Sequence, residues 1–292
     1  MKEKKDLMRK ILLALGLCLA CSISAFSSGF WLKVRGGIAT INGGDYNLGA
    51  TGSNDIYRLL FSNVSGVLSK LDRGLDLGIE AGLQVSRRLT LGVSLGYLST
   101  RKKDTVEYDW EIPLASFHDI TTITPHFFSI PVMLNLYYFF PLGPVRLNLG
   151  LGAGVYLCRF NYDNHFSSTQ FDWKYDYSWN ATKVVWGSQC GLGVEVPVGR
   201  QLFVSLDLVG RYAQVGNIRG QGRASGSLEG SPYFVTMPDQ YFWYYELLSG
   251  GASYPQTAFQ AFEPRDAAIS NVRKAHFCFT GFAASVGLKI VL

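Results

Sequence analysis

The chain has 292 residues, of which 48% are hydrophobic and only 17% are charged. This composition is apolar for a soluble domain of this length and argues against a disordered or fibrous chain. The formal net charge of +5 is concentrated in residues 1–10, which carry a net +3, so the remainder carries +2 and has no basic stripe. A nearly neutral remainder of this kind argues against nucleic acid as a partner.

The first 27 residues have the layout of a secretory signal. Basic residues are followed by the apolar run ILLALGLCLACSISAF and then by small polar residues. That run is too short to span a bilayer comfortably. We therefore expect a signal peptide over residues 1–27, cleaved near Ser24 or Ser27, and a single domain over residues 28–292. Lipidation at Cys21 is the alternative for this segment.

Three cysteines would remain after cleavage: Cys158, Cys190 and Cys278. An odd number in an exported protein does not describe a disulfide framework. We therefore interpret these cysteines as small hydrophobic residues on strands.

The segment LDLGIEAGLQV, residues 75–85, alternates strictly between aliphatic and other residues. Its odd positions are all aliphatic, and its even positions include Asp76, Glu80 and Gln84. After a short turn at residues 86–88, LTLGVSLGYL repeats the same period of two. Alternation of this kind predicts two antiparallel strands in a hairpin.

The same period occurs in six further segments. Two more hairpins are predicted, one turning at Pro141–Pro144 and one at Pro197–Arg200, and single strands are predicted near both ends of the mature chain. The eight predicted strands cover residues 30–39, 75–85, 89–98, 128–138, 145–157, 186–195, 202–211 and 279–292.

The face opposite the aliphatic one decides which environment the strands meet. A water-facing surface is rich in Lys and Glu, whereas this face is mainly Gly, Ser and Asn with a few charges of both signs. It suits the narrow interior of an eight-stranded barrel, which side chains just fill, while the aliphatic face meets lipid. The polar residues predicted to line the interior are Lys33, Arg35, Asp76, Glu80, Gln84, Arg146, Asn148, Gln189, Glu195, Asp207, Arg211 and Lys289. Opposite charges there suggest ion pairs such as Lys33 or Arg35 with Glu80, and Arg211 with Asp207.

The connections alternate between short turns and long loops. The long loops are predicted at residues 42–71, 102–125, 161–179 and 214–274. Short periplasmic turns and long extracellular loops are typical of outer-membrane barrels, and they place both termini in the periplasm.

Two of these loops also carry helix patterns. Apolar residues at helical spacing after Asn54 predict a helix in the first long loop. Pro238 and Gly250 bracket a second predicted helix in the last loop. Aromatic residues near strand ends, among them Tyr138, Tyr156, Trp186, Tyr212 and Phe277, suggest a girdle at the membrane interface.

Three segments, SIPVMLNLYYFF, LNLGLGAGVYL and GFAASVGLKIVL, resemble the small outer-membrane β-barrel domain proteins of Gram-negative bacteria. The resemblance extends over essentially the whole mature chain. It implies an all-β, eight-stranded antiparallel up-and-down transmembrane β-barrel in the cell outer membrane. It also implies outer-membrane lipid, lipopolysaccharide and the barrel-assembly machinery as partners, and a monomer without a cofactor. Such chains usually finish on an aromatic residue, whereas this one finishes on Leu292, which would weaken recognition by that machinery.

Residues that carry chemistry are few. His126 with Ser129, or His165 with Ser167, lies where a lipid A modifying enzyme would hold its site, but neither pair has an acid beside it. Cysteines and histidines are too scattered for a metal site. We therefore expect a non-enzymatic barrel whose loops have structural, shielding, adhesive or ligand-contact roles. Two alternatives stay open: a narrow conduit for small or hydrophobic molecules, and a lipid A modifying enzyme.

Overall fold

The computed structural model describes residues 29–112, 115–168, 173–228 and 231–292. The predicted signal peptide, residues 1–27, lies outside this range. The described residues form sixteen β-strands and one α-helix, and every strand pairing is antiparallel. The prediction of an all-β antiparallel fold is therefore confirmed, but the sheet has more strands than the eight predicted.

The elements in chain order are β1 (Phe30–Thr40), α2 (Asp45–Leu60), β2 (Ser62–Ser65), β3 (Arg73–Gln84), β4 (Leu89–Arg101), β5 (Asp104–Ile112), β6 (Ala115–Leu142), β7 (Val145–Ser168), β8 (Trp173–Pro197), β9 (Leu202–Tyr212), β10 (Gln214–Gly216), β11 (Arg219–Leu228), β12 (Ser231–Ser249), β13 (Ala252–Gln260), β14 (Ile269–Lys274), β15 (His276–Cys278) and β16 (Gly281–Val291).

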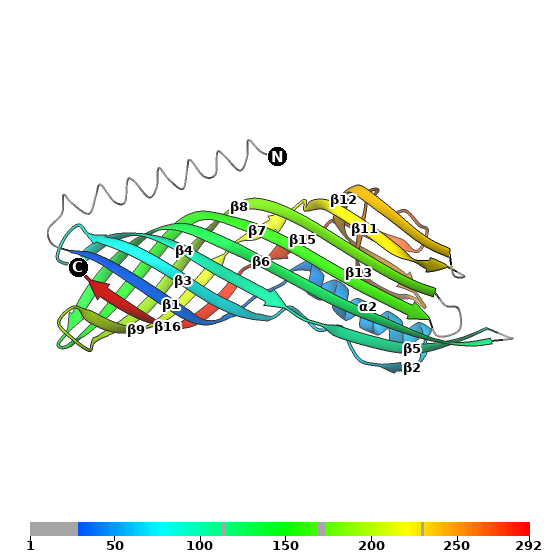
Figure 1. Cartoon of the computed structure of the whole chain (residues 1–292), viewed down its shortest axis with the longest axis horizontal. Coiled ribbons are helices and arrows are strands. Elements are labelled where there is room, and N and C mark those ends of the chain that lie inside the picture. The colour runs from blue at the N-terminus through cyan, green and yellow to red at the C-terminus, as the bar shows by residue number, and fades with distance from the viewer. Residues whose placement is uncertain (1–28, 113–114, 169–172, 229–230) are drawn as a thin grey trace.

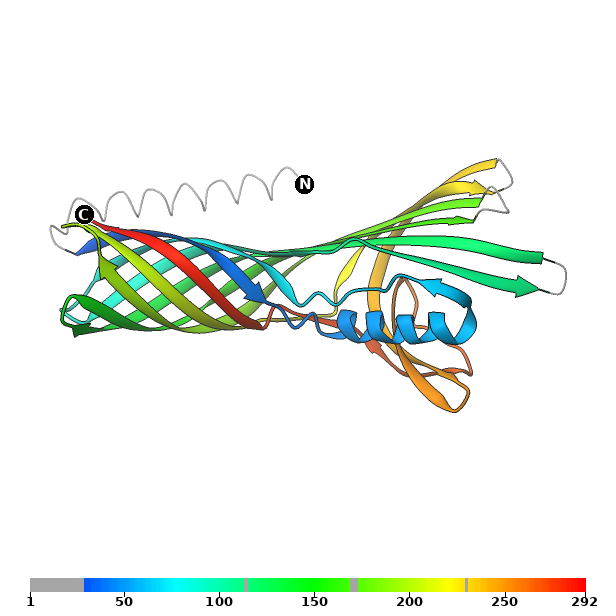
Figure 2. The same cartoon turned by 90° about the horizontal axis from the view of Figure 1, so that it is seen from below.

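Strand pairings run in a ring through β16, β1, β3, β4, β6, β7, β8 and β9. The ring returns to its start because β16 pairs with β1 on one side and with β9 on the other. We call these eight segments the strand ring. It forms the left half of the molecule in Figures 1 and 2, and the C-terminus lies at its far end, as the tight turns do.

The predicted loops at 102–125, 161–179 and 214–274 are wrong, because most of their residues lie in strands. β6, β7 and β8 continue past the ring, and β5 and β11 pair onto them. Strands β12, β13 and β14 widen this sheet. We call this second half, with α2, the extension; Figure 2 shows it curving away from the ring with α2 along one side.

The helix predicted after Asn54 begins earlier than expected. Helix α2 starts at Asp45, a residue whose negative charge suits a helix N-terminus. Asn54 lies inside the helix, where its side chain accepts a hydrogen bond from the Leu68 N–H at 2.7 Å and donates one to the Leu68 carbonyl at 2.9 Å. The prediction of Asn54 as a cap is therefore wrong. Within the described residues, no helix is long and apolar enough to cross a membrane.

The second predicted helix, between Pro238 and Gly250, is also wrong. These residues belong to β12, and Gly250 and Gly251 form the turn into β13. Both glycines have positive φ angles, 59° and 80°, which suit a tight hairpin turn. Aromatic density was a strand signal here rather than a helical one.

Along the three long strands, the inward side chains change from polar to apolar, and the outward ones change from apolar to polar. In the ring part of β7, the outward Leu149 and Leu151 are exposed and the inward Asn148 is buried. Twelve residues beyond Asn148, the inward residue is the buried Phe160, and the outward residue beside it is the exposed Arg159. β8 changes in the same way, from an outward Leu192 to an outward Asn180. The ring therefore has a polar interior and an apolar outer face, and the extension has the opposite arrangement.

Candidate functional site: the interior of the strand ring

Most of the predicted interior residues gather inside the strand ring. Those that are buried are Lys33, Asp76, Glu80, Asn148, Glu195, Asp207, Arg211 and Lys289, and those that are half-buried are Arg35 and Gln189. Gln84 and Arg146 lie opposite the buried Thr90 and Glu195 on the inward side, but both are exposed because they stand near strand ends. The Arg146 guanidinium lies over the Phe203 ring at 4.7 Å instead.

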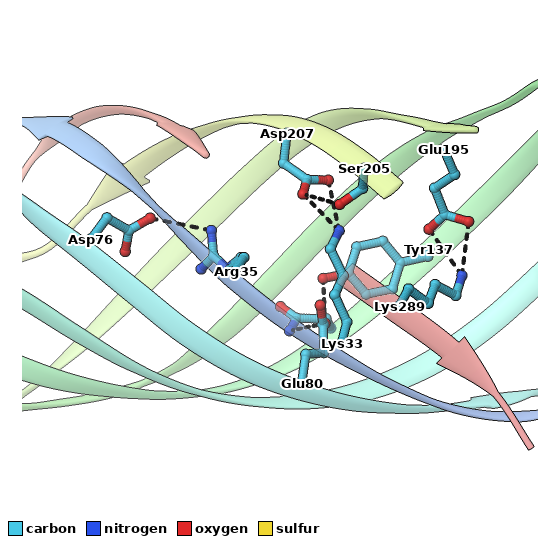
Figure 3. Close-up of polar contacts among 10 residues, drawn as sticks. Lys33, Arg35, Asp76, Glu80, Tyr137, Glu195, Ser205, Asp207 and Lys289 are labelled. Carbon is cyan, nitrogen blue, oxygen red and sulfur yellow. Dashed lines mark hydrogen bonds and ion pairs between the residues drawn. The ribbon is translucent and has the colours of Figure 1, made fainter. Parts of the chain in front are cut away.

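Two lysines on neighbouring strands each hold a carboxylate inside the ring. Lys33 Nζ lies 2.7 Å from Asp207 Oδ2, and the Ser205 hydroxyl donates to the same carboxylate at 2.9 Å. Lys289 Nζ donates to both oxygens of Glu195 at 2.9 Å. Figure 3 shows both contacts on adjacent strands of the wall. The predicted partner of Lys33, Glu80, is therefore wrong, and Asp207 takes its place.

Lys289 also lies between two aromatic rings. Its ammonium group is 4.4 Å from the Trp31 ring centroid and 4.6 Å from that of Phe139. Cation–π attraction adds to the Glu195 contact in a place from which bulk water is excluded. The Lys289 ammonium group therefore contacts the Glu195 carboxylate and two aromatic rings.

Asp76 accepts hydrogen bonds from two arginines. Arg211 Nη2 lies 2.7 Å from Asp76 Oδ2, and Arg35 Nη1 lies 3.3 Å from the same oxygen. The predicted pairing of Arg211 with Asp207 is wrong, because Asp76 occupies that position. Strands β9 and β3 are not adjacent in the ring, so the contact between Arg211 and Asp76 crosses the interior. Figure 3 shows the other contact of Asp76, with Arg35.

Glu80 is held by neutral donors rather than by a cation. The Tyr137 hydroxyl and the Asn135 amide, the latter at 3.0 Å, both donate to Glu80 Oε1. Asn135 also donates to Ser94 Oγ at 2.9 Å, and Gln189 donates to the Asn135 oxygen at 2.7 Å. These bonds join strands β3, β4, β6 and β8 into one polar network.

Sequence reasoning missed the neutral members of this network. Ser94, Asn135, Tyr137 and Ser205 all occupy inward positions of the same alternation that identified the charged residues. The period of two could have included them, since a buried carboxylate needs hydrogen-bond donors as well as cations.

The interior is filled. Four buried carboxylates, those of Asp76, Glu80, Glu195 and Asp207, face four cations, those of Lys33, Arg35, Arg211 and Lys289. A cavity lined by several of these side chains has a volume of about 30 Å³. A Cβ added at Gly152 or Gly193 would overlap interior side chains. The charges of these eight side chains therefore sum to zero.

A second, apolar layer follows where the ring meets the extension. Phe127, Phe160 and Phe277 are 0–2% exposed, and their ring centroids lie 4.9 to 5.6 Å apart. Tyr46 of α2 packs against Phe127 at 5.5 Å. The predicted aromatic girdle needs a correction here, because Phe277 and Tyr156 are buried inside, whereas Trp186, Tyr212 and Tyr138 are exposed on the outside.

The candidate catalytic pairs do not form. His126 lies on the outer face of β6 and Ser129 on the inner one, and the His126 ring instead lies 3.2 Å from Ser99 Oγ. His165 contacts Asp176, so the expectation that neither pair has an acid beside it is wrong for His165. The cysteines Cys158, Cys190 and Cys278 are free, and the described residues hold no group of three His, Cys, Asp or Glu side chains that could bind a metal ion.

The sequence profile of the outer membrane protein beta-barrel domain matches residues 13–224, which is more than half of the chain. The chain belongs to this family. This outer-membrane β-barrel protein is accordingly located in the outer membrane. A search of curated proteins found no match.

Two solved structures are similar to this outer-membrane β-barrel protein. One is a major outer membrane protein from Thermus thermophilus, with 12% identity, 88% of this chain and 99% of that chain covered, and a TM-score of 0.36. The other is the translocator domain of the autotransporter NalP from Neisseria meningitidis, with 8% identity, 99% and 97% coverage, and a TM-score of 0.19. Scores this low carry no argument about function.

Proposed function

We propose that the protein is a non-enzymatic, non-conducting outer-membrane β-barrel that displays its extension outside the cell. The strand ring is the closed, eight-stranded, membrane-spanning barrel, its tight turns lie in the periplasm, and the extension replaces the long extracellular loops. One observation carries the proposal: a neutral network of ion pairs fills the ring interior down to a cavity of about 30 Å³.

The outer face of the ring supports the membrane assignment. Four outward aliphatic residues, Leu149 and Leu151 of β7, Ile79 of β3 and Leu206 of β9, are 43 to 66% exposed. A protein that showed this band to water would expose a far larger apolar patch than soluble monomers do. Lipid covers the band in an outer-membrane barrel.

The extension supports a role at the cell surface. It is an ordered sheet closed by α2 rather than a set of loose loops, and Asp45 of α2 binds Arg273 of β14 through both guanidinium nitrogens. We propose that it shields the barrel or contacts ligands outside. The monomeric state, contact with lipopolysaccharide and folding by the barrel-assembly machinery are parts of the same proposal.

Single-channel recording in planar bilayers tests the closed interior. The purified protein should show no steady conductance, since the polar layer and the phenylalanine layer both close the ring. A stable nanosiemens pore would contradict the proposal. Liposome-swelling assays with small sugars provide a second readout, in which the protein should not accelerate swelling.

Labelling of intact cells tests the orientation. An impermeant maleimide should label Ser253→Cys, in the exposed turn region of the extension, and should not label Ser86→Cys in a tight turn. The parent chain, with its own cysteines, gives the background. Labelling of Ser86→Cys alone would show that the extension faces the periplasm.

A second candidate function, a conduit for small apolar molecules, is favoured by one observation. A recess of about 720 Å³ is lined by outer-face residues such as Leu134, Leu151 and Phe282 and also by the interior residues Gln189 and Arg211. Such a recess would suit lateral passage of an apolar solute through the wall. Uptake of a fluorescent apolar probe into protein-containing liposomes, above that into empty ones, would support this function.

The third candidate, a lipid A modifying enzyme, is weakened by the site itself. The His126 ring has a serine partner, Ser99, but within the described residues no carboxylate forms a hydrogen bond to it. Lipid mass spectra should be the same with the protein, without it and with Ser99→Ala. A mass change that disappears in Ser99→Ala would establish an enzyme.

A further inference from the structure

A pocket of about 380 Å³ lies on the outer face of the molecule at the level where the apolar band ends. On the side of the pocket that faces the tight turns, the outward residues of the ring are Phe128, Leu157 and Val184. At the pocket itself, the outward residues are polar. The lining residues are Arg101, Thr124, His126, Arg159, Asn161, Asp163, Ser178, Trp179 and Asn180.

Strand register brings the basic residues of the pocket together. Arg101 of β4 is the cross-strand partner of His126 of β6, and His126 is in turn the partner of Asn161 of β7. Arg159 lies two positions from Asn161 on the same face and donates from Nε to Asn161 Oδ1 at 3.4 Å. The two guanidinium groups therefore flank one imidazole.

The two arginines lack a carboxylate partner. Among the described residues, neither Arg101 nor Arg159 lies within 4.0 Å of a carboxylate oxygen. Asp163 is the one acidic residue of the lining, against two guanidinium groups. Burial lowers the pKa of His126, and the nearby positive charges of Arg101 and Arg159 lower it further. The pocket thus carries positive charge that the protein does not neutralise.

The chemistry of the lining indicates the ligand. Guanidinium groups form paired hydrogen bonds that match phosphate oxygens. The side chains of Thr124, Ser178 and Asn180 add donors and acceptors of the kind that sugar hydroxyls use. The apolar residues just below are exposed, Leu157 by 37% and Val184 by 59%, so acyl chains can cover them while the head of the same molecule reaches the pocket.

We propose that Arg101 and Arg159 bind the phosphate of a phosphorylated saccharide headgroup, that of a lipopolysaccharide molecule in the outer leaflet. Its acyl chains lie against Phe128, Leu157 and Val184, and Asn180 and Ser178 contact its sugar. This inference rests on the proposed orientation of the barrel, because only with the extension outside does the pocket meet the outer leaflet.

The test compares two double variants of the purified protein in lipid nanodiscs. Arg101→Ala with Arg159→Ala removes both guanidinium groups of the pocket. Arg87→Ala with Arg200→Ala removes two exposed arginines from the tight turns at the opposite end and serves as the matched control. Migration of unboiled and boiled samples in electrophoresis confirms that each variant is folded.

Binding of lipopolysaccharide is measured with its lipid A phosphates present and after enzymatic removal of those phosphates. The parent and the control should bind the phosphorylated form, and the pocket variant should bind it at least about tenfold more weakly, since two charge-assisted contacts are lost. Removal of the phosphates should weaken binding to the parent by a similar factor. Inorganic phosphate should compete only at a large excess.

Three results would overturn the inference. Equal affinity of the pocket variant and the parent would exclude the arginines as ligands. Equal affinity for the two lipid forms would exclude phosphate as the recognised group. Displacement by equimolar inorganic phosphate would identify a free anion, not a lipid, as the ligand. A reversed orientation is detected separately by the maleimide labelling of intact cells, so its failure is distinguishable from failure of this site.

Discussion

At the scale of single residues, the ring interior depends on buried carboxylates, three of which accept hydrogen bonds from two side chains each. Asp76 is 1% exposed and forms ion pairs with both Arg35 and Arg211. Buried charges are costly unless they are paired, and removal of one partner leaves the other uncompensated. Asp76 is therefore the residue whose loss should disturb the interior most.

We expect Asp76→Asn to destabilise the protein by about 3–5 kcal/mol, because two buried guanidinium groups lose their counter-charge. The matched control is Asp72→Asn, whose carboxylate is 55% exposed and lies 3.9 Å from Lys102; it should cost less than about 1 kcal/mol. Urea unfolding in detergent, followed by tryptophan fluorescence, measures both. Similar losses for the two variants would contradict the ion-pair network.

A second residue-scale contact joins β2 to the β5–β6 hairpin. Asp109 of β5 accepts hydrogen bonds from His118 Nδ1 at 2.7 Å and from Asn63 Nδ2 at 2.8 Å. The hydrogen bond with Asp109 raises the pKa of His118, and the contact with His118 lowers the pKa of Asp109. Since the folded pKa of His118 is above its unfolded value, the stabilisation is complete below the unfolded value, and it is lost as pH rises through the folded one.

We expect Asp109→Asn to lower the pKa of His118 toward its ordinary value. The change is read from histidine ring signals in NMR spectra recorded between about pH 5 and pH 9, a range that includes the ordinary value near 6.5. Asp55→Asn, an exposed change on α2, is the control and should leave the His118 titration unchanged. An unshifted His118 in Asp109→Asn would exclude Asp109 as the cause.

At the scale of single elements, the change in polarity of the two faces along β6, β7 and β8 explains which parts of these strands the sequence could predict. The ring segments show aliphatic residues at every second position, a pattern that is read directly. In the extension the alternation persists in β8, where Tyr175, Tyr177 and Trp179 alternate with Lys174, Asp176 and Ser178. Tyrosine and tryptophan carry a weaker apolar contrast than leucine, and Pro125 inside β6 reads as a strand breaker, so these parts resembled loops.

The position of the reversal can be measured with two substitutions on one face of β8. Leu192→Arg places a charge on the apolar band and should cost about 2–4 kcal/mol if it lies near the membrane midplane. Asn180→Arg, on the same face beyond the reversal, is exposed and should cost almost nothing. Recovery of each variant in outer-membrane fractions measures assembly. Equal recovery would contradict the membrane boundary placed between these residues.

At the scale of the whole molecule, the sequence predicted where the ring strands lie but not which interior side chains pair with one another. The eight segments predicted as strands all lie in strands of the larger sheet, because one apolar and one polar face leave a strong period of two. The ion-pair partners were wrong, since the choice between Glu80 and Asp207 for Lys33 depends on barrel stagger, which alternation does not encode. Contacts of α2 with β14, such as Asp45 with Arg273, join residues far apart in sequence and leave no local pattern.

Hydrogen–deuterium exchange should divide the molecule into two parts. Each ring strand has a hydrogen-bonded neighbour on both sides, so ring amides should exchange slowest. The strands at the two ends of the sheet, β2 and β13, lack a second neighbour in the described path and should exchange faster. Slow exchange of β13 amides with fast exchange of β16 amides would contradict this division.

The ladder between β6 and β7 runs without a register break from the pair Leu142↔Val145 at the tight turn to the pair Asp119↔Ser168 far into the extension. A force applied to the extension end of these two strands, for example by fluid drag or by an attached particle, therefore acts along the strands. Many hydrogen bonds of the ladder then share this force. Loading in this direction is resisted far better than peeling one bond at a time. In the proposed orientation, the extension is therefore joined to the membrane-embedded strand ring by one ladder that has no register break between these two pairs.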